Sequence, residues 1–373
     1  GSGPLVYLVD CPPLFGSGGI YGGGELEARR FALLAHAALH LCELLGWSPQ
    51  IVHCHDWHAA LVPVLLGTGF RSSRALREAS SVLTIHNIGY QGVFAGTLAP
   101  ELGIAAPAGA VGPGADLNFL KDGIVAADAL TTVSPTHAQE ILTAEYGKGL
   151  DPLLRQRRNR LVGILNGVDY AAWNPATDPT LPAHFDARDL TGRQTCRDAL
   201  LARAGLGTSS PALLLGMVTR LAEQKGLELV VDALPPLLRR REVQVVVLGQ
   251  GEARYAAQLR EMAAAFPGQF HYFDAQDEAL ARLVFAGSDA FLVPSIYEPC
   301  GLTQLYALRY GAVPVVRETG GLKDTVRHFD SRQRAGTGSV FKHANGDGLA
   351  WAIGEVLAWH RQPELWAALR QNG

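Results

Sequence analysis

The sequence predicts an α/β protein built from two domains with parallel sheets. Short apolar runs rich in β-branched residues alternate with longer segments of helical period along most of the chain, as in strands joined by crossover helices. The alternation occurs in two series with a break between them, and a length of 373 residues suits about two domains. The alternation of strands and helices predicts parallel sheets built from right-handed crossovers.

The first series supplies the N-terminal domain. The amphipathic segments Leu26–Leu45 and Thr136–Tyr146 predict helices, because their apolar residues recur at the helical spacing. The predicted strands are Val6–Asp10, Ile51–Asp56, Ser81–Asn87, Ala129–Ser134 and Val162–Leu165.

A Pro- and Asp-rich loop, Asn174–Pro179, marks the break between the two series, and the charged segment Gln194–Ala204 after it predicts a helix. We expect the two domains to join near this loop, and we assign residues 1–160 to the N-terminal domain and 161–373 to the C-terminal domain. The second series of strands is predicted at Leu213–Thr219, Val243–Gly249, Phe270–Phe273, Ala290–Pro294 and Val313–Arg317, with helices at Leu227–Arg239, Arg254–Phe266 and Glu278–Ala286.

The composition excludes several classes of protein. Hydrophobic residues make up 48% and charged residues 18%, as in a soluble globular protein with sizeable cores. A net charge of −3 argues against nucleic acid or an acidic membrane surface as a partner. The five cysteines are scattered without a CxxC pair, which argues against a disulfide framework or structural zinc and for a reducing compartment. No apolar run is long enough to span a membrane, and no signal peptide is visible.

Polar residues repeatedly follow the predicted strands. Ligands bind beyond the carboxyl ends of strands in open α/β sheets. Several such groups on one edge of two sheets therefore predict a single site in a cleft between the domains. The segments that follow strands in this way are His53–His58, His86–Asn87, Thr219–Arg220, Gly249–Glu252, Glu298 and Thr319–Gly321.

The turn from Glu298 to Gln304 is the strongest functional signal. It follows a buried strand that ends at Ser295 and precedes a helical segment from Leu305. A helix start favours anionic ligands, and a carboxylate placed there is costly for the binding of such an anion unless the chemistry needs it. Glu298 is therefore the first candidate for a catalytic group. Cys300 has no neighbouring base in the sequence, and we interpret it as a structural or contact thiol.

Two cations follow the first strand of the second series. Arg220 and Lys225 lie near a predicted helix start, where positive charge opposes the helix dipole. A diphosphate would compensate them, through bidentate contacts to the arginine and a point-charge contact to the lysine. The alternative is a solvated helix start.

Two glycine turns predict close approach of the backbone to a ligand. Gly249-Gln250-Gly251 matches part of a dinucleotide fingerprint, but Arg254 occupies the last glycine position, so the segment indicates a turn near a nucleotide more than an NAD site. Gly320-Gly321 opens a predicted helix and suits a phosphate or sugar cradle. A plain tight turn is the equal alternative.

The cluster of His53, His55 and His58 permits two interpretations. Its spacing suits zinc, but no Cys or carboxylate completes a tetrahedral set, so hydrogen-bonding groups around a polar ligand are preferred. For Asp56 the alternative to a functional role is a helix N-cap, and for Trp57 it is aromatic packing.

Taken in order, these segments resemble bacterial glycogen synthase and plant starch synthase. The resemblance implies two Rossmann-like domains whose parallel sheets face a cleft, the GT-B arrangement, and a retaining glycosyltransferase. Such an enzyme moves glucose from ADP-glucose to the non-reducing 4-OH of an α-1,4-glucan, and it needs no metal or other cofactor. The matching motifs cover nearly the whole chain and are His53–His58, Thr84–Gly92, Asp122–Thr136, Leu165–Asp169, Arg220–Gly226, Glu298–Gln304 and Thr319–Leu322.

The resemblance also implies roles for individual residues. Arg220 and Lys225 would hold the diphosphate and stabilise ADP as it leaves, while Glu298 would support positive charge at the anomeric carbon. His86 would hydrogen-bond the donor glucose. The other donor-binding residues implied are Asp56, Asn166, Cys300, Gly301, Leu302, Thr303, Gly249, Gly320 and Gly321.

Some features depart from the family pattern. The expected first strand with its Lys-Thr-Gly-Gly loop is missing, and the chain stops at Gly373 before an expected closing helix, so we expect truncation at both ends. Two alternatives stay open. One is an inactive fragment or a non-catalytic nucleotide- or glucan-binding protein, and the other, on fold analogy alone, is a nicotinamide-dependent dehydrogenase. The compartment implied is the bacterial cytoplasm, or the plastid for a plant protein.

Overall fold

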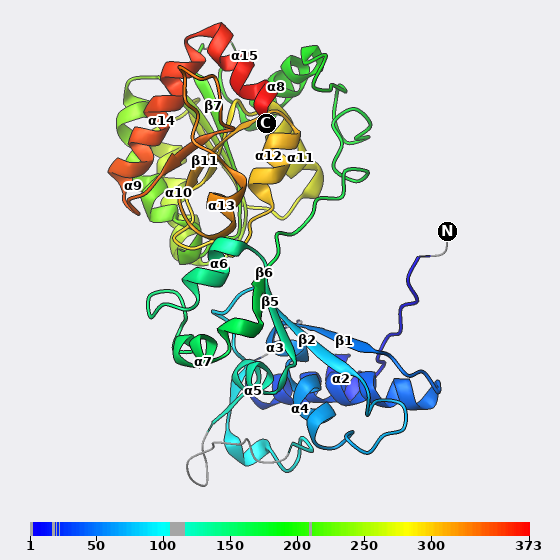
Figure 1. Cartoon of the computed structure of the whole chain (residues 1–373). Coiled ribbons are helices and arrows are strands. Elements are labelled where there is room, and N and C mark those ends of the chain that lie inside the picture. Colours follow the sequence, from blue (N-terminus) through cyan, green and yellow to red (C-terminus); the bar gives the residue numbers. More distant parts are fainter. Residues whose placement is uncertain (1–2, 17–18, 20, 22, 105–115, 209–210) are drawn as a thin grey trace. The chain divides into compact units, whose positions relative to one another are not determined.

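The computed structural model describes residues 3–16, 19, 21, 23–104, 116–208 and 211–373. The chain forms two compact units, Gly1–Ile164 and Leu165–Gly373, which divide close to the predicted boundary between residues 160 and 161. Each unit is an α/β structure with a parallel sheet (Figure 1), so the predicted fold class is confirmed. Within the described ranges, no helix has the length and apolar character needed to cross a membrane. The cleft between the domains stays a prediction.

The first unit contains a parallel sheet with the strand order β1-β2-β5-β6. Its strands are β1 (Ile51–His55), β2 (Ser80–Ile85), β5 (Ala129–Thr132) and β6 (Leu161–Gly163), and an antiparallel pair, β3 (Val93–Phe94) and β4 (Leu117–Asn118), lies outside the sheet. The helices are α1 (Pro12–Phe15), α2 (Gly24–Leu44), α3 (Asp56–Ala59), α4 (Leu61–Gly67), α5 (Phe119–Ala126), α6 (Pro135–Glu140) and α7 (Asp151–Gln156), with 3-10 turns at Gly96–Leu98 and Arg158–Arg160.

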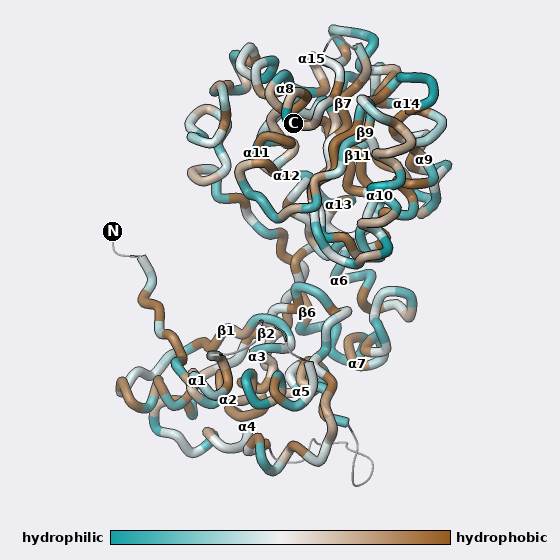
Figure 2. Tube along the Cα trace, turned by 180° about the vertical axis from the view of Figure 1, so that it is seen from behind, coloured by the Kyte–Doolittle hydropathy of each residue, from teal (hydrophilic) through white to brown (hydrophobic). Residues whose placement is uncertain are grey.

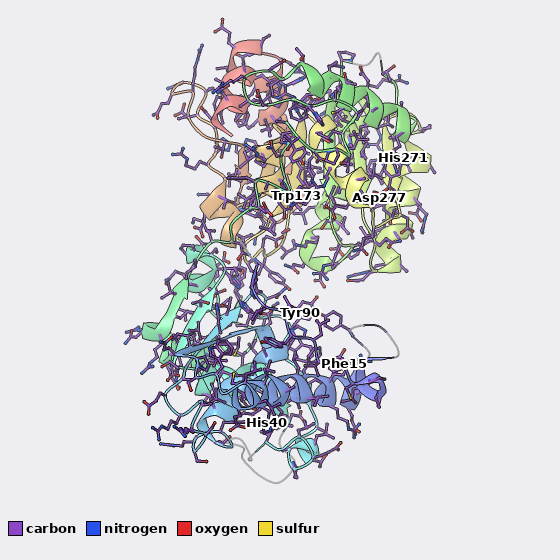
Figure 3. The ribbon with its side chains drawn as sticks, turned by 90° about the vertical axis from the view of Figure 1, so that its right-hand side faces the viewer. Phe15, His40, Tyr90, Trp173, His271 and Asp277 are labelled. Carbon is purple, nitrogen blue, oxygen red and sulfur yellow. The ribbon has the colours of Figure 1, made fainter. Side chains whose placement is uncertain are left out.

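Strand β1 of the first unit places Cys54 on its buried face between two exposed neighbours. Cys54 of β1 belongs to the same hydrophobic cluster as Leu39 of α2, whereas His40 of α2 is exposed (Figure 3). His53 and His55 flank Cys54 and are exposed, because successive strand residues point to opposite faces. The two histidines therefore share one face of the sheet.

The second unit contains a parallel sheet with the strand order β12-β11-β10-β7-β8-β9. Its strands are β7 (Leu213–Val218), β8 (Val243–Leu248), β9 (Phe270–Phe273), β10 (Ala290–Val293), β11 (Val313–Arg317) and β12 (Ser339–Phe341). The helices are α8 (Thr191–Ala204), α9 (Leu227–Arg239), α10 (Ala253–Ala265), α11 (Glu278–Gly287), α12 (Thr303–Arg309), α13 (Gly320–Thr325), α14 (Gly346–His360) and α15 (Pro363–Asn372), with a 3-10 turn at Glu223–Lys225.

This second sheet is covered on both faces. Every residue of β8 is buried; Val245 and Val247 belong to one hydrophobic cluster, and Val246 belongs to another. Burial on both faces explains the nearly continuous apolar sequence of the strands, which is brown along the interior of this unit in Figure 2. Among the covering helices, α11 is capped by Asp277 (Figure 3), whose Oδ1 accepts a hydrogen bond of 2.9 Å from the Leu280 amide.

The strand order of the second sheet reverses between β7 and β10. From β7 the chain adds β8 and β9 on one side, and it then returns to add β10, β11 and β12 on the other side. In doubly wound sheets ligands bind at the carboxyl ends of two such adjacent strands. The segments that leave β7 and β10 at this point carry Arg220 and Glu298, respectively.

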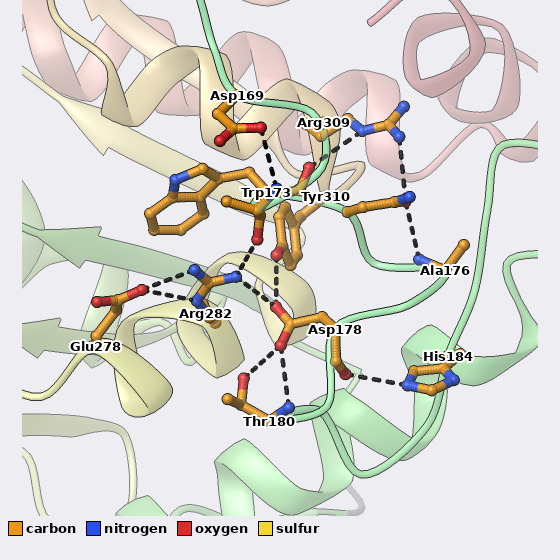
Figure 4. Close-up of polar contacts among 12 residues, drawn as sticks. Asp169, Trp173, Ala176, Asp178, Thr180, His184, Glu278, Arg282, Arg309 and Tyr310 are labelled. Atoms are coloured by element: carbon orange, nitrogen blue, oxygen red, sulfur yellow. Dashed lines mark hydrogen bonds and ion pairs between the residues drawn. The ribbon is translucent and has the colours of Figure 1, made fainter. Parts of the chain in front are cut away.

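The Pro- and Asp-rich loop is anchored within the second unit (Figure 4). The buried carboxylate of Asp178 accepts hydrogen bonds from Tyr310 Oη at 2.6 Å, Arg282 Nη1 at 3.0 Å and Thr180 Oγ1 at 2.7 Å. Burial would raise the pKa of Asp178, but these hydrogen bonds hold it below its usual range. The loop is therefore a fixed part of this unit, and the two units divide earlier, after Ile164.

Some predicted elements differ from the structure. Residues 6–10 hold no strand; Val6 is 75% and Leu8 is 89% exposed, so the strand prediction was wrong. A strand needs a hydrogen-bonding neighbour as well as an apolar sequence, and the described residues supply none there. The helix predicted to reach Tyr146 ends at Glu140 and continues as turns. β12, α14 and α15 have no counterpart among the predicted elements, although Asn345 caps α14 and Pro363 opens α15.

Candidate active site

A pocket of about 170 Å³ lies at the carboxyl ends of β7 and β10 in the second unit. It brings together Arg220, Lys225, Glu298 and Thr303, which were all predicted from the sequence as site residues. The reversal of strand order explains this gathering, since it makes two strands neighbours although Ala290 follows Val218 by 72 positions in the sequence. The other residues that line the pocket are Met217, Val218, Thr219, Leu292, Val293, Pro294 and Ser295.

Glu298 is buried and doubly hydrogen-bonded. Its Oε2 lies 2.6 Å from Lys225 Nζ and accepts a second hydrogen bond of 2.8 Å from Ser295 Oγ. The side chain of Glu298 is 9% exposed and that of Lys225 is 18% exposed, so this ion pair is largely desolvated. Charge-assisted hydrogen bonds in such surroundings fix the carboxylate in one orientation. Ser295 was not among the site residues predicted from the sequence, although its position at a strand end, three residues before Glu298, could have indicated it.

The loop that carries Glu298 is held at every backbone carbonyl from Ser295 to Gly301. Three buried side chains and one backbone amide supply the donors, so the loop has little freedom to move. Arg317 donates to the carbonyls of residues 295 and 296, Gln224 to 297, the Gly321 amide to 298 and 299, and Gln304 to 300 and 301. Arg317 is 7% exposed, Gln224 9% and Gln304 0%.

Gly320 and Gly321 pack directly against this loop. A Cβ on Gly320 would lie 2.0 Å from the Glu298 carbonyl oxygen, and one on Gly321 would lie 2.2 Å from that of Cys300. The Gly321 amide donates to the Glu298 carbonyl at 3.0 Å. These contacts favour close packing as the reason for both glycines, with the tight turn of Gly320 at φ +42°.

Gly249 also serves close packing. A Cβ there would lie 1.8 Å from the Thr219 carbonyl oxygen, so the glycine allows the ends of β7 and β8 to approach each other. Gly249 is not among the residues that line the pocket beside Glu298. Its predicted contact with the donor therefore stays a prediction.

Cys300 is a buried contact thiol, as interpreted from the sequence. It is 4% exposed, and burial raises the pKa of its thiol, which also makes a hydrogen bond with the backbone of Asn166. A thiol with a raised pKa is a poor nucleophile at neutral pH. The contact also places Asn166 beside the Glu298 loop, together with Gly301, Leu302 and Thr303.

His86 and Asp56 lie in the first unit. Asp56 Oδ1 accepts hydrogen bonds from the amides of His86 at 2.7 Å and Asn87 at 3.3 Å, beyond the end of β2. The N-cap of α3 is His55, so the N-cap interpretation of Asp56 was wrong; its carboxylate holds a neighbouring strand end instead. Asp56 has φ +56°, which is strained for a residue with a side chain and is typical of functional turns.

Histidines and threonines form hydrogen-bonded pairs across this sheet. His55 Nδ1 lies 2.9 Å from His86 Nε2, and His53 Nε2 lies 2.7 Å from Thr84 Oγ1. Burial, helped by the neighbouring histidines, lowers the pKa of His55. Within the described part of the chain, no group of three or more His, Cys, Asp or Glu side chains is placed to hold a metal ion. Trp57 is 5% exposed, with its ring centroid 4.8 Å from that of Phe31, which supports the packing role.

Comparison with known proteins identifies the family. The model of the starch synthase catalytic domain matches residues 2–156, and the model of glycosyl transferases group 1 matches residues 202–373. A glycogen synthase of Anaeromyxobacter dehalogenans is 48% identical over 99% of this chain and 78% of the relative. Another, from Aromatoleum aromaticum, is 42% identical over 100% of this chain and 77% of the relative.

A solved structure agrees with these relatives. The catalytic domain of starch synthase IV from Arabidopsis thaliana, bound to ADP and acarbose, matches with a TM-score of 0.87 and 36% identity. The match covers 94% of this chain and 74% of that structure, and it confirms the predicted GT-B fold class. The chain belongs to the glycogen synthase and starch synthase family of glycosyltransferases.

Proposed function

We propose that this protein transfers glucose from ADP-glucose to the non-reducing 4-OH of an α-1,4-glucan, with retention of configuration at the anomeric carbon. The observation that carries the proposal is the Lys225–Glu298 pair beside Arg220, because it sets two cations and one carboxylate around one pocket. Relatives named glycogen synthase, and a related starch synthase structure bound to ADP and acarbose, support these substrate classes.

Arg220 and Lys225 would stabilise the leaving group. When the bond between the anomeric carbon and the diphosphate oxygen breaks, ADP keeps the electron pair and gains negative charge. Arg220 presents a planar fork of donors to phosphate oxygens, and Lys225 has three N–H donors, of which one is directed to Glu298. Lys225 can therefore contact the carboxylate and a phosphate oxygen together. Cations fixed in advance cost no reorganisation during the reaction.

Glu298 would support the positive charge that develops at the anomeric carbon. Ser295 and Lys225 hold its carboxylate in place, and a fixed charge acts more strongly in a largely desolvated site than in water. With Arg220 and Lys225 as the compensating cations, the proposal calls for no metal or other cofactor.

The remaining predicted residues would bind the donor. His86 would hydrogen-bond the glucose, with its backbone held by Asp56. The residues proposed to surround the sugar and phosphates are Asn166, Cys300, Gly301, Leu302, Thr303, Gly320, Gly321 and Gly249. For a bacterial protein we propose a cytoplasmic location, in which its five free cysteines would stay reduced.

Incorporation of labelled glucose from ADP-glucose into glycogen tests the proposal. We expect Glu298→Gln to lower kcat by about 10²-fold or more, since it removes a charge used in the transition state, and to keep ADP affinity in calorimetry. Glu364→Gln, at an exposed carboxylate that pairs with Arg334, is the matched control. Unchanged turnover in Glu298→Gln would contradict the role of Glu298. Binding of ADP and maltooligosaccharide by the wild type without turnover would instead favour a non-catalytic binding protein.

A further inference from the structure

An exposed indole stands on α14, outside the pocket that contains Glu298. Trp351 is 52% exposed, whereas Trp359 on the same helix is 4% exposed. One face of the Trp351 ring stacks on His328, with the ring centroids 5.5 Å apart and the planes at 13°. The orientation of His328 is fixed in turn, because its Nδ1 accepts a hydrogen bond of 3.1 Å from the Val340 amide and its ring packs edge-on against Trp359. The exposed indole therefore rests on an imidazole whose own position is fixed.

A hollow of about 430 Å³ lies beside this ring. It is lined by Val340, Phe341, Lys342, His343, Asn345, Asp347, Gly348 and Trp351. We call the ring together with the residues that line this hollow the Trp351 platform. The hollow combines a small apolar wall with several polar side chains that remain exposed. One lysine and one aspartate contribute opposite charges to its lining, which favours a neutral polar ligand over a strongly charged one.

The Trp351 platform lies at the carboxyl edge of the same sheet that carries Glu298. β12 pairs with β11, and the Glu318 amide donates a hydrogen bond of 2.8 Å to the Phe341 carbonyl at the end of β12. Two residues after Glu318, the chain reaches Gly320, which packs on the Glu298 loop. The platform and the candidate active site therefore lie at the same edge of one sheet, at the ends of β12 and β10, with β11 between them.

A pyranose ring matches this combination of surfaces. Its C–H face is apolar and carries positive hydrogens, which are attracted to the negative face of an aromatic ring. Its hydroxyl rim requires hydrogen-bonding partners, which Asn345, His343 and Asp347 can provide. A rigid ring also loses little conformational entropy on binding. A docked peptide helix would call for a longer apolar groove than the three apolar side chains of this hollow provide.

We propose that the Trp351 platform binds glucosyl units of an α-1,4-glucan at a site distinct from the pocket that contains Glu298. The inference rests on the proposed function, in which the acceptor substrate is a glucan polymer that binds at this edge of the sheet. A second contact on the same polymer raises the effective concentration of chain ends at the active site without altering the chemistry.

Affinity electrophoresis in gels that contain glycogen tests the proposal with the full chain. Trp351→Ala is expected to weaken retardation by glycogen about tenfold, as loss of one anchoring aromatic does in a small site. Trp47→Ala is the matched control, because Trp47 is 57% exposed and lies in the first unit. Trp351→Phe keeps an aromatic face and is expected to recover part of the affinity. The KM for glycogen should rise in Trp351→Ala, while kcat on maltotriose and the calorimetric affinity for ADP stay unchanged.

Three results would overturn the proposal. Equal retardation of Trp351→Ala and Trp47→Ala would show that the indole does not bind glucan. An equal loss of activity on maltotriose and glycogen would show that the substitution damages the fold or the active site. A change in oligomeric state of Trp351→Ala, measured by light scattering, would assign the exposed ring to a protein interface. Retardation requires no turnover, so failure of the proposed transferase activity would be recognised separately with the wild type on maltotriose.

Discussion

Lys225 Nζ lies 2.6 Å from Glu298 Oε2, although the two residues follow different strands of the second sheet. The pair is largely desolvated, and each partner is costly to bury alone. We expect Lys225→Met to destabilise the protein by about 3 kcal/mol, because it leaves a buried carboxylate without its cation. Chemical denaturation of the single variants and of Lys225→Met/Glu298→Gln measures the coupling. If the double variant is no more stable than the sum of the single effects predicts, the two side chains do not act as a pair.

Gln304 holds two carbonyls of the loop that carries Glu298. Gln304→Leu keeps the volume but leaves the carbonyls of Cys300 and Gly301 without their donor, at a cost of about 2 kcal/mol. We expect kcat to fall at least tenfold, since small displacements of a catalytic group are costly, while KM for ADP-glucose changes less. Steady-state kinetics and thermal unfolding measure the two effects. Gln362→Leu, at an exposed glutamine that donates to one helix carbonyl, should leave both measurements unchanged; equal effects from the two substitutions would refute the positioning role.

The imidazole of His55, which lies within hydrogen-bond distance of His86, predicts a loss of stability at acidic pH. Burial lowers the pKa of His55 below its usual value of 6.5 in the folded protein. The unfolded chain therefore binds this proton first as pH falls, so the stability that the neutral ring contributes is complete above pH 6.5 and declines below it. NMR titration of the imidazole signals and denaturant unfolding at several pH values test this expectation. His55→Asn should flatten the acidic limb of the stability profile, and a limb that persists unchanged would assign the titration to another group.

Asp178 predicts a second, more acidic transition. Its pKa is held below the usual 3.8, despite burial, by hydrogen bonds from Tyr310, Thr180 and Arg282. This contribution to stability is present above the unfolded value of 3.8 and is lost as pH falls through the lower folded value. We expect Asp178→Asn to cost about 2 kcal/mol at neutral pH, as loss of a charged hydrogen-bond acceptor does.

Denaturant unfolding at several pH values distinguishes the role of Asp178 from a general charge effect. Asp198→Asn, at an exposed carboxylate that accepts one hydrogen bond from Gln194, should change stability by less than about 0.5 kcal/mol. Identical pH profiles of wild type and Asp178→Asn would rule out a contribution of this carboxylate.

The strands of the second unit could be predicted from the sequence because they are buried on both faces. Val243–Leu248 and its neighbours are nearly continuous apolar runs, and no other element type suits runs of that length. The run Val6–Asp10 has a similar sequence but no strand, because hydrogen-bonding partners are a property of the whole sheet. Short elements such as β12, with three residues, carry too little pattern to be recognised alone.

The sequence by itself determined the chemical types at the candidate site and the family to which they belong. Arg220, Lys225 and Glu298 belong to short motifs that follow predicted strands, and such motifs can be recognised in the sequence because a turn depends on residues that are close together in the chain. Only the tertiary structure decided which of these residues meet: the reversal of strand order makes β7 and β10 neighbours and joins Lys225 to Glu298. It also decided that Ser295, Gln304, Gln224 and Arg317 hold Glu298 and its loop, because hydrogen bonds between distant segments depend on packing that no local pattern encodes.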